Sequence, residues 1–295
     1  MLQRDYQAAT IDPTKLQIGI ARVEVGTVDI GAIKDSSIEI TTIVKERYEG
    51  YPAQRMKSET ESVSAIATVT AEEIGSYPVV SILQNLFSNL QMQNSTTYSI
   101  AMFAGLAGVD NLRLAVTAQI LPELSIDWQD DWSNVRFKFE CIAANAQALL
   151  AKSLVNGNRQ SATTVSTGNL SIGKPKVVYN SNSIGSIQSA SLTLSGNTKK
   201  QTLGYPQCTA KVIYLDSNIT ISIVSEEGEL PVSDDCKITL QQALVDGGYL
   251  EFEFPHCKVL DDLAVAPNND WLGYKRKVLP FKSGTDNIVN FNRRN

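Results

Sequence analysis

Few residues of this 295-residue chain have types and spacing that could support bond chemistry. The single histidine, His256, precedes Cys257, and an imidazole that activates a thiol is one form of nucleophilic site. Successive residues of a strand point to opposite faces, so the two side chains cannot act together if 249–257 is a strand. We therefore interpret His256 as a half-buried strand residue and not as a general base.

The other candidate reactive groups have simpler interpretations. Cys208 has Gln54 at the matching position of the first half of the chain, so a duplicated thiol site is not supported. Asp127, Asp130 and Asp131 could bind Ca²⁺, but they lack EF-hand spacing and fit a solvated loop. Phosphate-binding loops, zinc-hydrolase motifs and nucleophile elbows are missing from the sequence. We expect no catalytic residues, no metal site and no cofactor, and therefore no enzyme.

Composition excludes further classes of protein. The net charge of −5 and the sequence pI of about 5.1 argue against binding to nucleic-acid phosphates, which requires clustered Lys and Arg. The four cysteines form no CxxC pair, which predicts reduced thiols. The start of the chain has no apolar segment typical of a secretory signal, and no run approaches the roughly 20 apolar residues of a membrane span. We expect a protein made in the cytoplasm and without a membrane span.

An internal repeat is the strongest pattern in the sequence. Residues 16–73 align with 170–227 without a gap, at a constant offset of 154 positions. The identical residues include, in each copy, two Ile-Gly pairs, one Gly-Tyr-Pro triplet and one Glu-Glu pair. The segment 153–169 is rich in Ser, Thr, Asn and Gly, which favours a linker. The sequence therefore predicts a first domain over 1–152 and a second over 170–295.

The expected elements of each copy are mainly strands. Equally long polar stretches, 44–57 and 197–211, predict projecting loops or hairpins. Alternation over 59–71, with Ile66 as the exception, predicts a strand with one face on a core, and the second copy keeps the same parity. A helix is expected to follow each strand, from Pro78 in the first copy and between 233 and 248 in the second.

The first copy has about 18 extra residues, placed roughly at 90–107. The predicted fold class is α+β, mainly β: two tandem β-sandwich or rolled-sheet domains with one packing helix each.

These residues resemble the phage tail tube protein family. The resemblance is carried by IGIARVEV at 18–25, the Ile30-Gly31 pair, SIEI at 37–40, and an alternating strand that ends in Glu-Glu before an amphipathic helix. The first copy fits from Leu16 to about Leu90, and the second copy fits from Leu170 to Leu244.

The resemblance implies a β-sandwich whose inner strands join neighbouring subunits into a barrel around a lumen. The polar loops would contact the next ring, through Tyr51, Pro52, Tyr205 and Pro206. The hydroxyl-bearing strand faces would line the lumen, through Ser62, Ser64, Thr68, Thr70, Asn218, Thr220 and Ser222. Glu72, Glu73, Glu226 and Glu227 would make subunit contacts, or else supply negative charge to a helix N-terminus.

Tubes of this family are usually built from hexameric rings, so a doubled chain implies a pseudo-hexameric ring of three chains. The implied partners are further copies of the chain, the tape measure, tail tip and terminator proteins, and DNA that passes through the lumen without specific binding. The implied location is the virion. Two alternatives stay open: another duplicated tail ring component, such as a baseplate hub or distal tail protein, and a β-sandwich carbohydrate-binding module with a site around Trp271.

Overall fold

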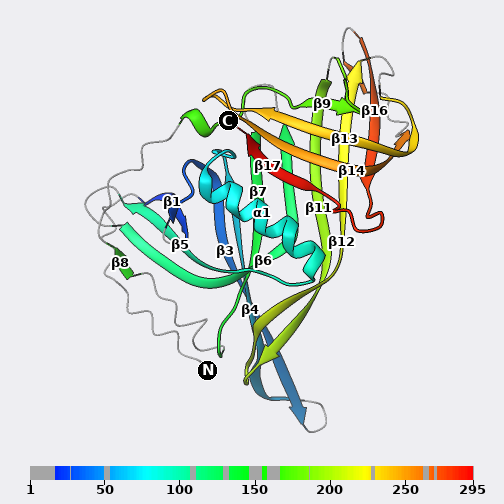
Figure 1. Ribbon diagram of the computed structural model, residues 1–295. Coiled ribbons are helices and arrows are strands. Elements are labelled where there is room, and N and C mark those ends of the chain that lie inside the picture. The colour runs from blue at the N-terminus through cyan, green and yellow to red at the C-terminus, as the bar shows by residue number, and fades with distance from the viewer. Residues whose placement is uncertain are drawn as a thin grey trace.

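The fold is dominated by strands. The computed structural model describes residues 17–26, 28–49, 54–106, 111–128, 133–145, 155–157, 167–185, 187–226, 230–261, 266–268 and 271–294. Within these ranges all strands connect into one hydrogen-bonded sheet, and a single α-helix lies across it (Figure 1). The expectation of a mainly β protein is confirmed.

The first half of the chain pairs its strands in a non-sequential order. Its elements are β1 (Gln17–Val25), β2 (Val28–Asp29), β3 (Ile33–Glu49), β4 (Gln54–Ala71), α1 (Tyr77–Met92), β5 (Thr97–Leu106), β6 (Asn111–Trp128) and β7 (Ser133–Cys141). The antiparallel order is β2-β1-β5-β6-β7-β4-β3.

The second half repeats this order. Its elements are β9 (Lys176–Tyr179), β10 (Asn182–Ser183), β11 (Ile187–Leu203), β12 (Gln207–Glu226), β13 (Ser233–Ala243), β14 (Tyr249–Asp261) and β16 (Trp271–Pro280). The antiparallel order is β10-β9-β13-β14-β16-β12-β11. The remaining elements are β8 (Val155–Gly157), the 3₁₀ turn η1 (Thr167–Asn169), β15 (Ala266–Asn268) and β17 (Asn290–Arg294). β8 pairs with β6 inside the stretch expected to be a linker.

The two long hairpins, β3–β4 and β11–β12, have the same internal register. All three register shifts of β3–β4 recur in β11–β12 at the offset of 154. For example, the shift between Ile43 and Val44 recurs between Asn197 and Thr198. Both hairpins project from the same end of the molecule (Figure 1), where β12 runs parallel to β4 for two residues.

The alternation expected over 59–71 is confirmed. From residue 63 onward the odd-numbered side chains of β4 are at most 1% exposed, and these are Val63, Ala65, Ala67, Val69 and Ala71, whereas Glu61 is exposed. The core that they enter is one cluster of apolar side chains drawn from both halves. The period of two in the sequence therefore predicted correctly which face of this strand is buried.

Helix α1 begins as expected, with Pro at its N-terminal turn and an apolar stripe buried beneath it. The stripe belongs to the first half of the chain, but the helix also packs on the second half. The ring centroid of Phe87 lies 6.3 Å from that of Phe252 and 5.9 Å from that of Phe291. The helix therefore fills space between the halves (Figure 1) and does not cover one half alone.

The second expected helix is wrong, because 233–243 forms strand β13. Cys236, Ile238 and Leu240 alternate with polar residues and are buried on one side of that strand. β13 holds the place that β5 holds in the first half: Ile100 pairs with Val25, and Ile238 pairs with Tyr179. The offset between these strands is 138, and the decrease of 16 equals the length of α1. The extra residues of the first half are thus the helix itself and not 90–107.

Candidate assembly surfaces

The residues expected to line a lumen lie on one continuous sheet face. Thr70 pairs with Arg136, Arg136 with Ser125, Ser125 with Thr193, and Thr193 with Thr220. Cross-strand partners share a face of the sheet, so this row links β4 of the first half to β12 of the second. The remaining members of the expected set keep the same parity on these two strands: Ser62, Ser64, Thr68, Asn218 and Ser222. Thr68 is nevertheless buried within the chain, at 7% exposure, and so is not open surface. We call this side the polar face.

The polar face carries charges of both signs. Its basic residues are Arg136, Lys138, Lys275 and Lys277, at equivalent places on β7 and β16. Its acidic residues on β3, β6, β7 and β12 are Asp35, Glu39, Glu123, Asp127, Asp216 and the buried Glu140. Lys138 and Glu123 form an ion pair with an Nζ–Oε2 distance of 2.5 Å. Among the described residues of these strands, the face is therefore rich in hydroxyl groups and carries more acidic than basic side chains.

The two halves meet where β11 pairs with β6, and we call this pairing the junction. Its register runs from Ala190 opposite Trp128 to Leu194 opposite Leu124. Main-chain ladder bonds and buried apolar side chains therefore continue from one half into the other without a break.

A buried carboxylate strengthens the contact beside the junction. Glu140 of β7 is 0% exposed, and its Oε2 lies 2.8 Å from Nζ of Lys200. Its Oε1 accepts a hydrogen bond of 2.7 Å from the Thr209 hydroxyl. A carboxylate without such partners would be costly to bury, so these two bonds tie hairpin β11–β12 to the first half.

Two further bonds connect β12 to β6. The main-chain N–H of Val212 donates to the Gln119 side-chain oxygen at 2.6 Å. The Tyr214 hydroxyl donates to the Ile120 carbonyl at 2.7 Å, and burial raises the pKa of this tyrosine. Both bonds hold the second hairpin against the bent part of β6, where its pairing with β7 shifts register.

The outer edge of β3 differs from that of β11. β3 pairs with β4 on one edge, and no strand among the described residues pairs with its other edge. Three apolar side chains are exposed along β3: Ile40, Ile43 and Val44. The residue equivalent to Ile40 at the offset of 154 is Leu194, which is buried at the junction.

The hairpin tips are only partly described. Tyr51 and Pro52 lie outside the described residues. Tyr205 is 69% exposed, and its hydroxyl donates to Glu59 Oε2 of the first hairpin at 3.1 Å. The neighbouring Leu203 is also exposed, whereas Pro206 is half-buried. The second tip therefore presents apolar and aromatic surface at the projecting end.

The paired glutamates do not serve the helix N-terminus. The first turn of α1 has no acidic residue, so that interpretation is wrong. Glu73 is 3% exposed, and its Oε1 accepts a 3.0 Å bond from the Ala32 N–H. Glu72 is half-buried, while the side chain of Glu226 and all of Glu227 lie outside the described residues.

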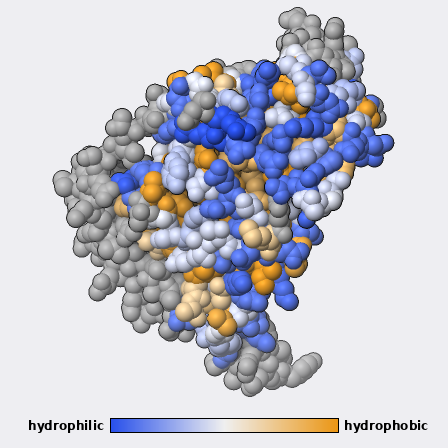
Figure 2. Space-filling model, in the orientation of Figure 1, coloured by the Kyte–Doolittle hydropathy of each residue, from blue (hydrophilic) through white to orange (hydrophobic). Residues whose placement is uncertain are grey.

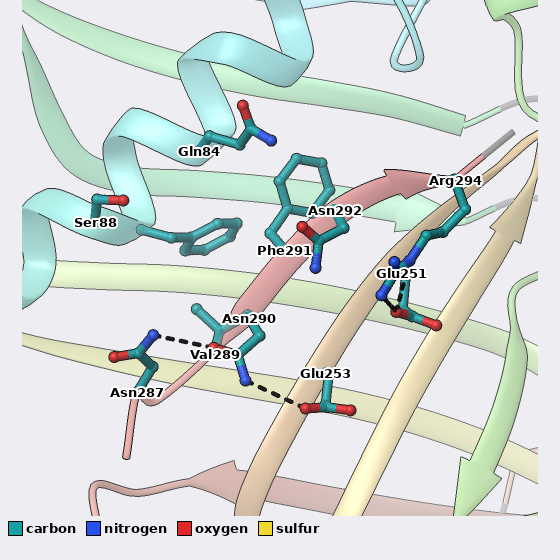
Figure 3. A pocket seen from close by; sticks show the side chains of 11 residues that line it. Gln84, Ser88, Glu251, Glu253, Asn287, Val289, Asn290, Phe291, Asn292 and Arg294 are labelled. Carbon is teal, nitrogen blue, oxygen red and sulfur yellow. Dashed lines mark hydrogen bonds and ion pairs between the residues drawn. The ribbon is translucent and has the colours of Figure 1, made fainter. Parts of the chain in front are cut away.

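A polar groove lies on the face that carries α1. It has a volume of about 370 Å³ and lies between α1, β14 and β17 (Figure 3). Glu251 pairs with Arg294, and Glu253 pairs with Lys237, which lowers the pKa of Glu253. The surrounding surface is hydrophilic over β13, β14 and β17 (Figure 2). Since both carboxylates are already satisfied, the groove gives little support for a ligand site.

His256 is half-buried, as expected, and is part of a surface cluster. Its Nδ1 lies 3.0 Å from Asp235 Oδ1, and its Nε2 lies 3.1 Å from Asp286 Oδ2. Cys257 is buried in the core, which raises the pKa of its thiol. Across the ranges that the structure describes, no group of three or more His, Cys, Asp or Glu side chains could hold a metal ion.

Comparisons with known proteins assign this chain to no family. No protein-family model matches the sequence, and no curated protein matches it. Of the described part of the chain, no helix is long and apolar enough to cross a membrane.

Proposed function

We propose that this protein is a structural subunit that assembles into stacked rings and forms a phage tail tube. The observation that carries the proposal is the polar face, which runs without interruption from β4 through the junction to β12. Because the outer edge of β3 has no strand partner in the described chain, the same face can continue into a neighbouring copy.

We further propose that the chain is a tandem duplication. The matching pairing orders and the shared register shifts of the two long hairpins support it. Each chain would supply two of six equivalent positions, so three chains would close one pseudo-hexameric ring. Two like domains in one chain can replace two like subunits in a cyclic assembly.

The function of such a ring would depend on its shape, since stacked rings enclose a channel through which DNA can pass. In a hydroxyl-rich lumen whose carboxylates outnumber its cations, phosphate groups would not be held, so DNA could slide during ejection. The subunit itself would use no catalytic residue, metal or cofactor. Its partners would be further copies of itself and the tape measure, tail tip and terminator proteins, and its location would be the virion.

A tail ring component that does not stack, such as a hub or distal tail protein, is the second candidate. It would share the polar face and the open β3 edge. The exposed apolar surface at the second hairpin tip, at Leu203 and Tyr205, favours stacking. The side chains around Trp271, on which a carbohydrate-binding module would rely, lie outside the described residues.

Negative-stain electron microscopy of the purified protein tests the proposal. The expected result is open-centred tubes or stacked rings. A double variant, Tyr51→Glu with Tyr205→Glu, is expected to give single rings, because charge at both tips opposes the ring-to-ring contact. Tyr77→Glu, at an exposed tyrosine outside the hairpins, is the control and is expected to leave tubes unchanged. Compact single particles without a central opening would overturn the proposal.

A further inference from the structure

Two of the four cysteines face each other across neighbouring strands. Cys236 of β13 is the direct cross-strand partner of Cys257 of β14. Cys141 and Cys208 lie on other strands, opposite residues that are not cysteine. All four thiols are free in the structure. We propose that Cys236 and Cys257 form a site of oxidative cross-linking, where a small-molecule disulfide converts the two thiols into one intrachain disulfide bond.

The side chains of this pair lie on the same, buried face of the sheet. Cys236 is 5% exposed, Cys257 is 0% exposed, and both belong to the apolar core. The Cys236 thiol donates to the main-chain carbonyl of Cys257, with an Sγ–O distance of 3.4 Å. Opposed residues of antiparallel strands have Cα atoms about 4.5–5.5 Å apart, and a disulfide spans about 4.4–6.8 Å between Cα atoms. The main chain therefore already has the spacing that a disulfide requires.

Charged contacts at the surface hold the two strands together at this point. Nζ of Lys258 lies 2.8 Å from Asp234 Oδ1, and Nδ1 of His256 lies 3.0 Å from Asp235 Oδ1. The ladder between β13 and β14 shifts register on both sides of Cys236. An irregular ladder bends more readily than a regular one, so the Cβ atoms can approach by the roughly 1 Å that bond formation needs.

Cys236 is the more accessible of the two thiols. The pairing of β9 with β13 ends at Ile238, and the preceding residues Asp234 and Asp235 are exposed. Local opening at this end of β13 would therefore expose Cys236 before Cys257. Burial raises the pKa of both thiols, so little thiolate is present near neutral pH. We expect the reaction to take hours rather than seconds.

The chemistry is a thiol–disulfide exchange in two steps. The Cys236 thiolate attacks one sulfur of the small-molecule disulfide, whose S–S bond breaks and releases one small thiolate. The Cys257 thiolate then attacks the Cys236 sulfur of this mixed disulfide, which forms the intrachain bond and releases the second small thiolate. Two electrons pass from the protein to the oxidant, and the two protons lost by the cysteines are taken up by the two small thiols.

The cross-link would stabilise the pairing of β13 with β14, which run side by side in the second half (Figure 1). The cysteines are 21 positions apart, and a disulfide that closes such a loop restricts the unfolded chain. Only the timing rests on the proposed function: thiols stay reduced in the cytoplasm, where rings would assemble, and would be oxidised after release of the virion.

Peptide mapping of the full-length protein after incubation with oxidised glutathione tests the site. Trypsin cleaves after Lys237, which places the two cysteines in separate peptides, 212–237 and 238–258. The folded protein, quenched with a thiol-alkylating reagent before digestion, is expected to give these peptides joined in most molecules. Dithiothreitol is expected to separate them, and protein kept reduced throughout is expected to give both peptides separate and alkylated.

Two variants distinguish the pair from the remaining thiols. Cys236→Ala is expected to abolish the joined peptides. Cys208→Ala removes a buried cysteine outside the pair and is expected to retain them. The oxidised wild type should unfold at a higher urea concentration than the reduced wild type, because the cross-link restricts the unfolded chain. The same oxidant should produce no such shift in Cys236→Ala.

Three results would overturn the site: glutathione attached to Cys236 without joined peptides, peptides that join only in urea, and a bond to Cys141 or Cys208. Electron microscopy of the same oxidised sample reports ring assembly separately. Cross-linked protein that forms no rings would contradict the proposed function and leave the site intact. Rings whose peptides stay separate after oxidation would contradict the site and leave the proposed function intact.

Discussion

Ile40 and Leu194 occupy equivalent positions in two hairpins of identical register, yet Ile40 is 45% exposed and Leu194 is 1% exposed. The difference arises because β6 pairs with β11 and no described strand pairs with β3 on that side. Full burial of such a side chain contributes about 1.5–3 kcal/mol. Covering the β3 edge would therefore stabilise an assembly by the same interaction that stabilises the chain internally.

Removal of the cation beside Glu140 is expected to destabilise the chain. Lys200→Ala removes the cation and leaves the buried carboxylate with the hydrogen bond from the Thr209 hydroxyl, so we expect a loss of about 1.5–3 kcal/mol in the free energy of unfolding. Urea denaturation measures this loss. Lys199→Ala, at the exposed neighbouring position, is the control and should change stability by no more than about 0.5 kcal/mol. Equal urea concentrations at the unfolding midpoint of the two variants would contradict the structural role of Glu140.

The glycines on either side of β2, Gly26 and Gly31, allow a matched test of how closely Glu73 packs against the backbone. Gly31 and Gly26 both have positive φ, at +87° and +72°. A Cβ at Gly31 would lie 2.5 Å from Cδ of Glu73, whereas a Cβ at Gly26 would meet no atom within 4 Å. Gly31→Ala should therefore cost about 1–3 kcal/mol more than Gly26→Ala, since it adds overpacking to the same backbone strain. Thermal or urea unfolding of both variants measures the difference. Similar losses would mean that Glu73 moves aside freely.

The His256 cluster predicts a pH dependence of stability. Contacts with Asp235 first, and then with Asp286, raise the pKa of His256 above 6.5. A histidine whose pKa is raised by folding contributes stability that is fully present below about pH 6.5 and is lost as the pH rises through the folded pKa. The melting temperature of the wild type should therefore fall more between pH 6 and pH 8 than that of His256→Gln. If the melting temperatures of the two proteins changed identically with pH, protonation of His256 would not be coupled to folding.

The sequence alone predicted the correct element wherever one face of that element is buried against neighbouring segments of the chain. The alternation around Ala65 and Ala67 and the apolar stripe of α1 each place burial on one side, and both elements form as expected. The parity of β4 and of β12 also predicted that the hydroxyl groups of each strand lie on one face of that strand. The junction that joins those two faces depends on pairing between distant strands and has no local signal.

The wrong predictions concern segments whose structure is decided by tertiary contacts. Ser233, Asp234 and the Gly247-Gly248 pair fit the capping and ending signals of a helix, but this segment extends the sheet between β9 and β14. The period of two at Cys236, Ile238 and Leu240 was the signal that could have identified the strand. Glu140 has the parity of an exposed residue and is buried only because a hairpin some 60 residues away packs over it.

The mass of the protein in solution tests the central claim most directly. Size-exclusion chromatography with light scattering should give three times the 32.2 kDa of one chain, or multiples of that value when rings stack. Ile40→Lys, which places a charge on the outer edge of β3, should reduce the mass to one chain while the circular dichroism spectrum stays unchanged. A wild-type mass of 32.2 kDa at all concentrations, or the same multimer in both proteins, would contradict assembly through this edge.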